Sequence, residues 1–240
     1  MNARELLKAG KLNEAVQALG AEVRDNPTDA QRRIFLFELL CFAGDYERAN
    51  KHLELIGEGS AQTKLGALLY RGALAADRTR QEMFEKRDFP TGAKPKSEIT
   101  GTLNGKPFKS LTDADPRIGA RLEVFVAGSY AWIPFEHIAS VEIEPPKRLR
   151  DLLWTPAMVH TGPSFEGKEL GEVLLPALAA LTWKHSDDAV RLGRATVWED
   201  VPETGESVPL GQKMLLVDDE EVPFLELRKL EIAATNGQAS

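Results

Sequence analysis

The 240-residue sequence contains one cysteine, Cys41, and no apolar run approaching the ~18 residues of a membrane span. A single cysteine excludes an internal disulfide framework and a four-cysteine zinc site, and it is typical of a reducing compartment. The N-terminus also lacks the basic and apolar pattern of a signal peptide. We therefore expect a cytoplasmic protein that does not enter a membrane, with Cys41 as a small buried side chain on the apolar face of a helix.

A block of positive charge is missing as well. The chain carries 30 Lys and Arg against 37 Asp and Glu, a formal net charge of −7. The acidic excess lies entirely in residues 89–240, with 16 basic and 23 acidic side chains, because residues 1–88 hold 14 of each. A chain without a basic face gains little from counterion release, so nucleic acid is a poor candidate for its partner.

Patterns typical of catalysis are absent. The four histidines are isolated, without a second histidine or a carboxylate at ligand spacing: His52, His137, His160 and His185. No glycine-rich phosphate loop and no Gly-x-Ser-x-Gly turn occurs. Asp113 and Asp115 resemble a cation-binding pair, but we expect Asp115 to cap a short helix that begins at Pro116. The sequence therefore favours a protein that is not an enzyme and that holds neither a cofactor nor a metal.

What the first 56 residues do contain is an internal repeat with a period of 34 residues, from Gly10 to Gly44. Residues 10–15 read GKLNEA and residues 44–49 read GDYERA, and a polar turn with Pro27 separates the copies. Two leucine pairs recur at the same spacing, Leu6 with Leu40 and Leu19 with Leu53. Glycine, a bulky apolar residue, alanine and a closing proline at this period are the signature of tetratricopeptide helical hairpins.

We predict an all-α domain of this type over residues 1–88. Its helices are expected at about 3–9, 12–25, 29–43 and 46–56, followed by a terminal capping helix over about 61–84. On that last helix, the apolar residues that share one face are Leu65, Leu68, Leu69 and Ala76. Residues 89–97 contain prolines, a glycine and polar side chains without periodicity, and we interpret them as an interdomain linker.

Residues 98–240 are predicted to form the second domain, which makes the fold class α+β with mostly antiparallel strands. Asn104-Gly105 indicates a two-residue hairpin between strands at 99–103 and 106–108. A short helix over 116–128 would bury Ile118, Leu122 and Phe125. Further strands are expected at 130–135, 140–143, 154–160, 171–175, 195–199, 213–217 and 222–232, with a turn at 218–221.

Stacked helical hairpins curve, and their first helices line a concave groove that suits a peptide or a helix. Counting from the repeat's glycines, the residues expected to face this groove are Arg4, Leu7 and Lys8 in the first copy and Gln31, Ile34, Glu38 and Phe42 in the second. Their mixture of apolar and charged side chains suits an amphipathic helix. Alternatively, the capping helix or the second domain covers Ile34 and Phe42, and the sequence leaves both possibilities open.

Two other hypotheses concern the second domain. Trp132 and Trp154 offer a second interaction surface, although large aromatic side chains in short-stranded domains usually lie in the core. In a small-ligand-binding or hydrolytic alternative, with the helices as a dimerisation module, Asp113, His137 and Trp132 would share a cleft. In a scaffold alternative, exposed aromatic residues would join two copies of the chain, so a homo-oligomer stays open.

Several long, irregular blocks carry a resemblance to a known family. They are FLFELLC at 35–41 with GDYERA at 44–49, GTLNGKPF at 101–108 with DAD at 113–115, GSYAWIPFEHI at 128–138, LRDLLWTPA at 149–157 and GQKMLL at 211–216. Together they resemble the ImpE/TagJ family, also called SciE-type proteins, over almost the whole chain.

The resemblance implies a cytoplasmic, non-enzymatic accessory protein of bacterial type VI secretion. It also implies partners: family members bind an N-terminal helix of the sheath's small, TssB-like subunit. They are also linked to the ClpV-type unfoldase that recycles contracted sheath. No catalytic residue carries over. We therefore expect an adaptor whose helical repeats hold an amphipathic helix, while its α+β domain offers a second surface.

Overall fold

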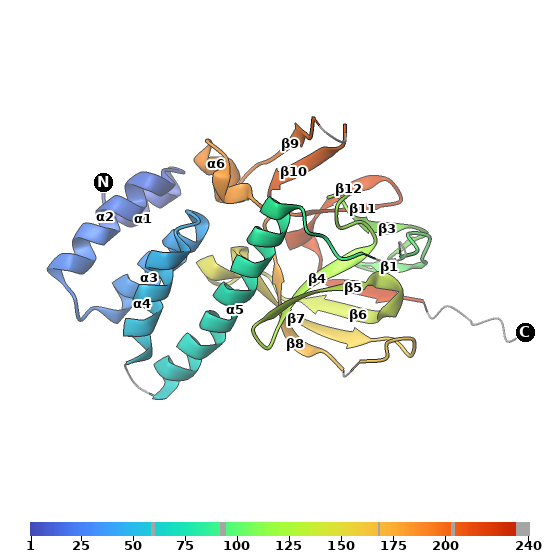
Figure 1. The fold of residues 1–240 in the computed structure, drawn as a ribbon, viewed down its shortest axis with the longest axis horizontal. Coiled ribbons are helices and arrows are strands. Elements are labelled where there is room, and N and C mark those ends of the chain that lie inside the picture. Colours follow the sequence, from blue (N-terminus) through green and yellow to red (C-terminus); the bar gives the residue numbers. More distant parts are fainter. Residues whose placement is uncertain (59–60, 92–94, 168, 203–204, 234–240) are drawn as a thin grey trace, which may run out of the picture.

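The computed structural model describes residues 1–58, 61–91, 95–167, 169–202 and 205–233. Its N-terminal part is a stack in which each helix packs against the next along the chain. The helices are α1 (Ala3–Lys8), α2 (Leu12–Asp25), α3 (Ala30–Phe42), α4 (Tyr46–Gly57) and α5 (Ala61–Lys86). The helices predicted from the repeat are confirmed, and α5 lies between the other helices and the sheet (Figure 1).

The residues that recur in the repeat form the turns and the close contacts of the paired helices. Gly10 and Gly44 adopt positive φ angles of 77° and 73°, which glycine tolerates and which reverse the chain between paired helices. Ala15 and Ala49 are both 0% exposed, because only a small side chain fits where the paired helices meet. The side chain of Asp45 accepts a hydrogen bond from the backbone N–H of the third residue of α4 and so caps that helix.

An eight-stranded antiparallel sheet dominates the C-terminal part, with the strand order β2-β1-β13-β6-β7-β8-β4-β5. Its strands are β1 (Gly101–Leu103), β2 (Lys106–Phe108), β4 (Arg121–Val126), β5 (Ser129–Pro134), β6 (Ile138–Ile143), β7 (Trp154–Thr161), β8 (Gly171–Pro176) and β13 (Lys229–Ile232). Asn104 and Gly105 have φ angles of 50° and 79°, as the predicted hairpin requires.

Smaller elements complete this part. A three-stranded sheet has the order β12-β11-β3 and a two-stranded sheet pairs β10 with β9. The bounds are β3 (Leu111–Asp113), β9 (Thr196–Asp200), β10 (Ser207–Gly211), β11 (Met214–Val217), β12 (Glu220–Pro223) and α6 (Asp188–Arg191). Short 3-10 turns are η1 (Phe135–His137), η2 (Leu149–Leu152), η3 (Thr182–Lys184) and η4 (Phe224–Glu226).

The helix predicted over 116–128 is wrong. The middle of this segment is strand β4, which pairs along its whole length with β5. Both faces of β4 are buried, and burial on both faces hides the alternation of apolar and polar residues that identifies a strand. Ile118, Leu122 and Phe125 therefore fit a helical spacing, although Leu122 and Phe125 lie in separate cores on the two faces of the sheet.

Other differences involve very short elements. Strands β3 and β10 and helix α6, of three to five residues each, were not predicted because so few residues show no period. The strand predicted over 222–232 is interrupted, because β12 ends at Pro223, η4 follows, and β13 begins at Lys229. The acidic turn lies at Asp218 and Asp219, which have positive φ angles.

Two apolar cores lie on opposite faces of the large sheet. The inner core, on the side of the small three-stranded sheet, includes Val124, Val141, Val159, Leu175 and Leu215. The outer core joins the other face to the helices and includes Leu36, Phe37, Leu74, Trp154 and Leu174. We call the face turned towards α5 the outer face of the sheet.

The domain boundary at 89–97 stays a prediction, and residues 92–94 lie outside the described part of the chain. Phe89, at its start, packs against Phe84 of α5 with the ring centroids 5.1 Å apart. Within the described ranges, none of the helices is both long and apolar enough to span a bilayer.

Candidate functional site

The predicted groove of the helical repeats is open at α1 and at the start of α3. Arg4, Lys8 and Gln31 are exposed there, and Leu7 and Ile34 are half-buried. The Arg4 guanidinium lies 5.0 Å from the ring centroid of Phe35, so α1 and α3 meet at this point. This face offers a small apolar surface between charged side chains.

The other two predicted groove residues are buried beside the C-terminal part of the chain. Glu38 is 7% exposed and Phe42 is 1% exposed. Nη1 of Arg150, in η2, donates to Oε1 of Glu38 at 3.0 Å, and its guanidinium lies 4.5 Å from the ring centroid of Tyr70. For Phe42, the alternative of burial is therefore correct. The repeat identifies the face of α3 but gives no sign of what packs against it.

Trp154 does not form part of a surface. It is 1% exposed, and its ring stacks on Tyr70 of α5 at 6.2 Å and lies 6.2 Å from Phe37 of α3. Its indole N–H donates to Oδ2 of Asp77 at 3.2 Å. The aromatic ring therefore anchors the sheet against α3 and α5.

Two arginines near α6 hold the turns of the repeats. The Arg194 guanidinium donates to the carbonyl oxygens of Leu7 at 2.6 Å and Lys8 at 3.1 Å, at the end of α1. Arg191 donates to the carbonyl oxygen of Ala43 at the end of α3, at 3.4 Å. Positive side chains at helix C-termini satisfy free carbonyls and the helix dipole. The C-terminal part of the chain thus contacts both repeats.

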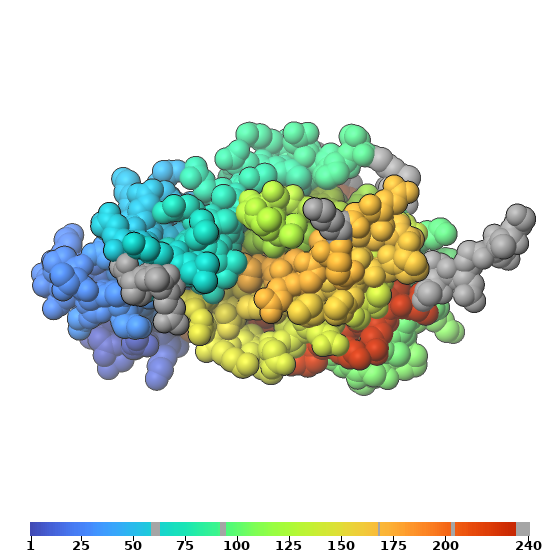
Figure 2. Space-filling model, turned by 90° about the horizontal axis from the view of Figure 1, so that it is seen from below, coloured from blue at the N-terminus to red at the C-terminus, as the bar shows by residue number. Residues whose placement is uncertain are grey.

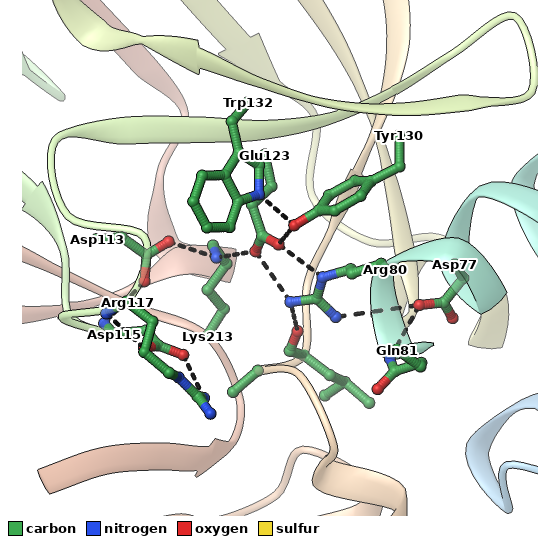
Figure 3. Close-up of polar contacts among 12 residues, drawn as sticks. Asp77, Arg80, Gln81, Asp113, Asp115, Arg117, Glu123, Tyr130, Trp132 and Lys213 are labelled. Atoms are coloured by element: carbon green, nitrogen blue, oxygen red, sulfur yellow. Dashed lines mark hydrogen bonds and ion pairs between the residues drawn. The ribbon is translucent and has the colours of Figure 1, made fainter. Parts of the chain in front are cut away.

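A buried cluster of charged groups joins the C-terminal half of α5 to the outer face of the sheet (Figure 3). Nε and Nη2 of Arg80 donate to the two carboxylate oxygens of Glu123, on β4, at 2.7 and 2.9 Å. Lys213 forms ion pairs with Glu123 and Asp113. Asp77, one turn before Arg80, lies 4.0 Å from it.

The protonation of this cluster follows from burial and charge. Burial opposes ionisation of Glu123, but the charges of Arg80 and Lys213 outweigh it and lower the pKa of that carboxyl. Burial raises the pKa of Asp113 to about 7, although Lys213 opposes the shift. Burial and the Glu123 charge raise the pKa of the Tyr130 hydroxyl, which donates to Glu123 at 2.5 Å. The cluster is therefore a set of paired interior charges.

The space beside the cluster is small. A cavity of about 20 Å³ is lined by Asp77, Arg80, Cys41, Tyr46 and other side chains, and it has room for about one water molecule. Arg80, Glu123 and Lys213 are 2% exposed or less. A substrate does not reach these groups in this conformation, so the cluster holds the two halves of the protein together.

The carboxylates proposed as a cation pair have other partners. Asp115 accepts hydrogen bonds from the backbone N–H of Arg117 at 3.0 Å and from its guanidinium, within a local turn. It does not cap a helix as predicted, because the chain turns here into β4. Oδ1 of Asp113 accepts the Asp115 backbone N–H at 2.9 Å. Among the described residues, no three potential ligands are grouped to hold a metal ion.

His137 lies apart from Asp113 and Trp132, which both belong to the buried cluster, because the Trp132 indole N–H donates to the hydroxyl of Tyr130 (Figure 3). The Nδ1 atom of His137 lies 2.9 Å from the hydroxyl of Ser164. Trp132 is half-buried and stacks on Phe89 at 6.0 Å, while Asp113 pairs with Lys213 as described above. The cleft imagined for a ligand-binding alternative therefore has no counterpart in the contacts of these three side chains.

Known proteins resemble this chain in both sequence and fold. A family model described as "ImpE protein" matches residues 105–231. The type VI secretion system accessory component TagJ of Pseudomonas aeruginosa is 34% identical, over 98% of this chain and 92% of that protein. The crystal structure of a Vibrio parahaemolyticus protein has the same fold, with a TM-score of 0.83, 24% identity and coverage of 98% of each chain. The chain therefore belongs to the ImpE family.

Proposed function

We propose that this chain is a cytoplasmic accessory protein of a bacterial type VI secretion system and acts as an adaptor, not as an enzyme. The observation that carries the proposal is the 34% identity with TagJ, which extends over both the helical part and the sheet. The buried charges support it, because they pair with one another and the cavity beside them has room for about one water molecule.

The adaptor binds, through its helical layer, an amphipathic helix from the N-terminus of the sheath's small, TssB-like subunit. Helical repeats bind partners through the faces of their first helices, which here are α1, α3 and α5. The part of the expected groove that remains accessible is small: Arg4, Leu7, Lys8, Gln31 and Ile34. Through the same complex, the adaptor takes part in sheath recycling by a ClpV-type unfoldase.

Calorimetric titration with a synthetic peptide of that N-terminal helix tests the proposal. We expect saturable binding, whereas a peptide of the same composition in scrambled order should not bind. Ile34→Glu places a charge on the open face of the repeats and tests that surface alone. Absence of binding to the unaltered protein would contradict the proposed partner.

A further inference from the structure

A ridge of leucines on α5 stands beside a long groove in the outer face of the sheet. Leu65, Leu68 and Leu69 are 71%, 64% and 54% exposed, and they account for half of the exposed large hydrophobic side chains in the described chain. Their i, i+3, i+4 spacing places them together along the N-terminal half of the helix. The sheet packs mainly on the C-terminal half of α5, and nothing within the described ranges covers this ridge.

The groove encloses about 1260 Å³, which exceeds the roughly 300–1,000 Å³ of ordinary small-molecule pockets. One wall is α5 from Leu68 to Ala75, and the other sides are the β4–β5 turn and the segment that follows β6. Figure 2 looks onto this face, where α5 (cyan), the β4–β5 turn (yellow-green) and β8 (orange) surround the hollow. A hollow of this size suits a segment of protein better than a small molecule.

The charged side chains beside the ridge are all basic. Between residues 61 and 76, α5 contains Lys64 and Arg71 and no acidic residue. Both side chains are exposed and share the side of the helix that carries Leu68. A lysine in the first turn of a helix opposes the helix dipole, so Lys64 does not stabilise α5 itself. Neither side chain forms an ion pair with another described residue.

The floor of the groove changes from apolar to acidic with distance from α5. The row nearest the helix crosses β7, β8 and β4 and is apolar: Pro156, Leu174 and Phe125. The next row crosses β6, β7 and β8 and carries two acidic residues: Glu142, Met158 and Glu172. The groove therefore has an apolar side along α5 and an acidic side opposite.

Most other charged groups around the floor already have partners. Two glutamates pair with lysines: Glu142 with Lys229 at 3.9 Å, and Glu144 with Lys147 at 3.7 Å. Arg228 donates to two backbone carbonyl oxygens near η4, and Asp151 accepts from two backbone N–H groups. Glu172 is exposed and forms no ion pair within the described part of the chain. The unpaired charge is therefore negative on the sheet side and positive on the helix side.

The floor strands determine which secondary structure can occupy the groove. β6, β7 and β8 each pair on both sides, so an extended peptide finds no free strand edge there. A helix satisfies its own backbone hydrogen bonds and needs only an apolar face. The stretch of α5 from Leu65 to Ala75 is about 15 Å long, which matches about three helical turns.

The N-terminal half of α5 has the features that such an occupant needs. It is a helix of this length, it presents exposed leucines, and its unpaired charges are basic where the floor is acidic. A two-fold symmetric contact requires one surface to carry both complementary features. Because the ridge and the groove adjoin each other on the same chain, each of two copies can place its ridge in the groove of the other.

We propose that two copies of this chain form a symmetric dimer in which the α5 ridge of each copy lies in the groove of the other. The two N-terminal halves of α5 run in opposite directions, and Arg71 of each copy faces Glu172 of the other. The interface contains none of the residues on the open face of α1 and α3, so this inference is independent of the proposed function. The dimer carries that face twice, and two linked sites bind a partner present in many copies more tightly than one site does.

Light scattering after size-exclusion chromatography measures the mass of the unaltered protein over a series of concentrations. We expect the mass to rise from that of one chain, 26.5 kDa, towards twice that value. A mass that stays at 26.5 kDa up to about 0.2 mM, where a micromolar dimer would be nearly complete, would overturn the proposal.

Matched leucine variants test the location of the interface. Leu69→Glu places a charge on the ridge, and Leu55→Glu makes the same change at a leucine that is 48% exposed on α4 and does not line the groove. Leu69→Glu should raise the Kd of the dimer about tenfold or more, because it buries a charge against apolar side chains. Leu55→Glu should change the Kd less than about twofold, with circular dichroism showing that both variants are folded. A dimer that survives Leu69→Glu uses another surface, which overturns the proposal.

A charge exchange between copies gives a second, independent readout. In a dimer of Arg71→Glu chains, two acidic side chains meet at each contact, and in a dimer of Glu172→Arg chains two basic side chains meet. Each variant alone should therefore dimerise several-fold more weakly than the unaltered protein. An equimolar mixture of the two variants restores opposite charges at both contacts, so we expect mixed dimers to form.

This mixture separates the proposed contact from a general loss of structure, because two variants that merely unfold do not rescue each other. Labelling one variant with an affinity tag and recovering the untagged variant with it measures the mixed dimer. If the mixture dimerises no better than either variant alone, Arg71 does not face Glu172 across the interface and the proposed arrangement is wrong.

Discussion

Replacing Arg80 with methionine removes the central cation between α5 and the sheet. The Arg80 side chain is buried, donates to both oxygens of Glu123 at 2.7 and 2.9 Å, and donates to the Leu178 carbonyl oxygen at 3.1 Å. Methionine keeps much of the volume, but within the described ranges it leaves the Glu123 carboxylate with Lys213 as its remaining ion-pair partner. The Leu178 carbonyl also loses this donor.

The expected magnitude follows from that geometry. Removing one member of a buried ion pair lowers the free energy of unfolding by about 3–5 kcal/mol, because a charge stays buried without compensation. For a chain of this length, each kcal/mol shifts Tm by about 2–4 °C, so we expect Arg80→Met to lower Tm by roughly 6–20 °C. Urea unfolding followed by tryptophan fluorescence measures the free energy, and thermal melting followed by circular dichroism measures Tm.

Two comparisons make this prediction refutable. Arg48→Met breaks an exposed pair with Asp45 of 3.0 Å and should change stability by less than about 1 kcal/mol. In a double-mutant cycle with Glu123→Gln, the double variant should lose about 1–3 kcal/mol less than the sum of the single losses. If Arg80→Met costs no more than Arg48→Met, or if the cycle is additive, the cluster does not hold α5 on the sheet.

Three further predictions concern single sites. Gly44→Ala should be about 1–3 kcal/mol more destabilising than Gly10→Ala in urea unfolding: both have positive φ, but only at Gly44 would the added Cβ meet an obstacle, the Trp183 ring at 2.4–2.8 Å. Burial raises the pKa of the Asp113 carboxyl from 3.8 to about 7. The stabilising contribution of this raised pKa to the free energy of unfolding is therefore complete below about pH 4 and is lost as the pH rises through 7. The stability of Asp113→Asn relative to the unaltered protein should therefore increase between pH 5 and pH 8, and urea midpoints that differ equally at both values would contradict this. Because burial raises the pKa of the Cys41 thiol well above its usual value, a thiol reagent should modify it slowly in the folded protein and rapidly in urea, and equal rates would refute its burial.

Local sequence signals account for the helical part and for many of the strands. The positions of Gly10, Gly44, Ala15 and Ala49 depend on contacts between neighbouring helices, so their spacing alone predicts the paired hairpins. The Asn104-Gly105 turn is equally local. By contrast, β4 is buried on both faces by segments distant in sequence, and its apolar spacing therefore imitated a helix.

For the candidate site too, the sequence predicts some features and gives no sign of others. Arg4, Lys8 and Gln31 are exposed in the structure, and their role in a groove stays a prediction, but the repeat gives no warning that Arg150 covers Glu38, 112 residues away. Likewise, the apolar spacing of Leu65, Leu68 and Leu69 shows that they share a face of α5, but not that this face stays open.

The sequence by itself determined the helical repeat, the α+β class and the resemblance to the ImpE family, because each depends on residues close together in the chain. Only the tertiary structure decided which faces of the helices and of the sheet are buried and which stay exposed. Arg80 pairs with Glu123 across 43 residues, and Lys213 reaches Glu123 across 90. Charged residues so far apart are indistinguishable in sequence from solvated surface charges, because their pairing depends on how α5 packs on the sheet. The same packing buries one half of α5 and leaves the other half beside an open groove.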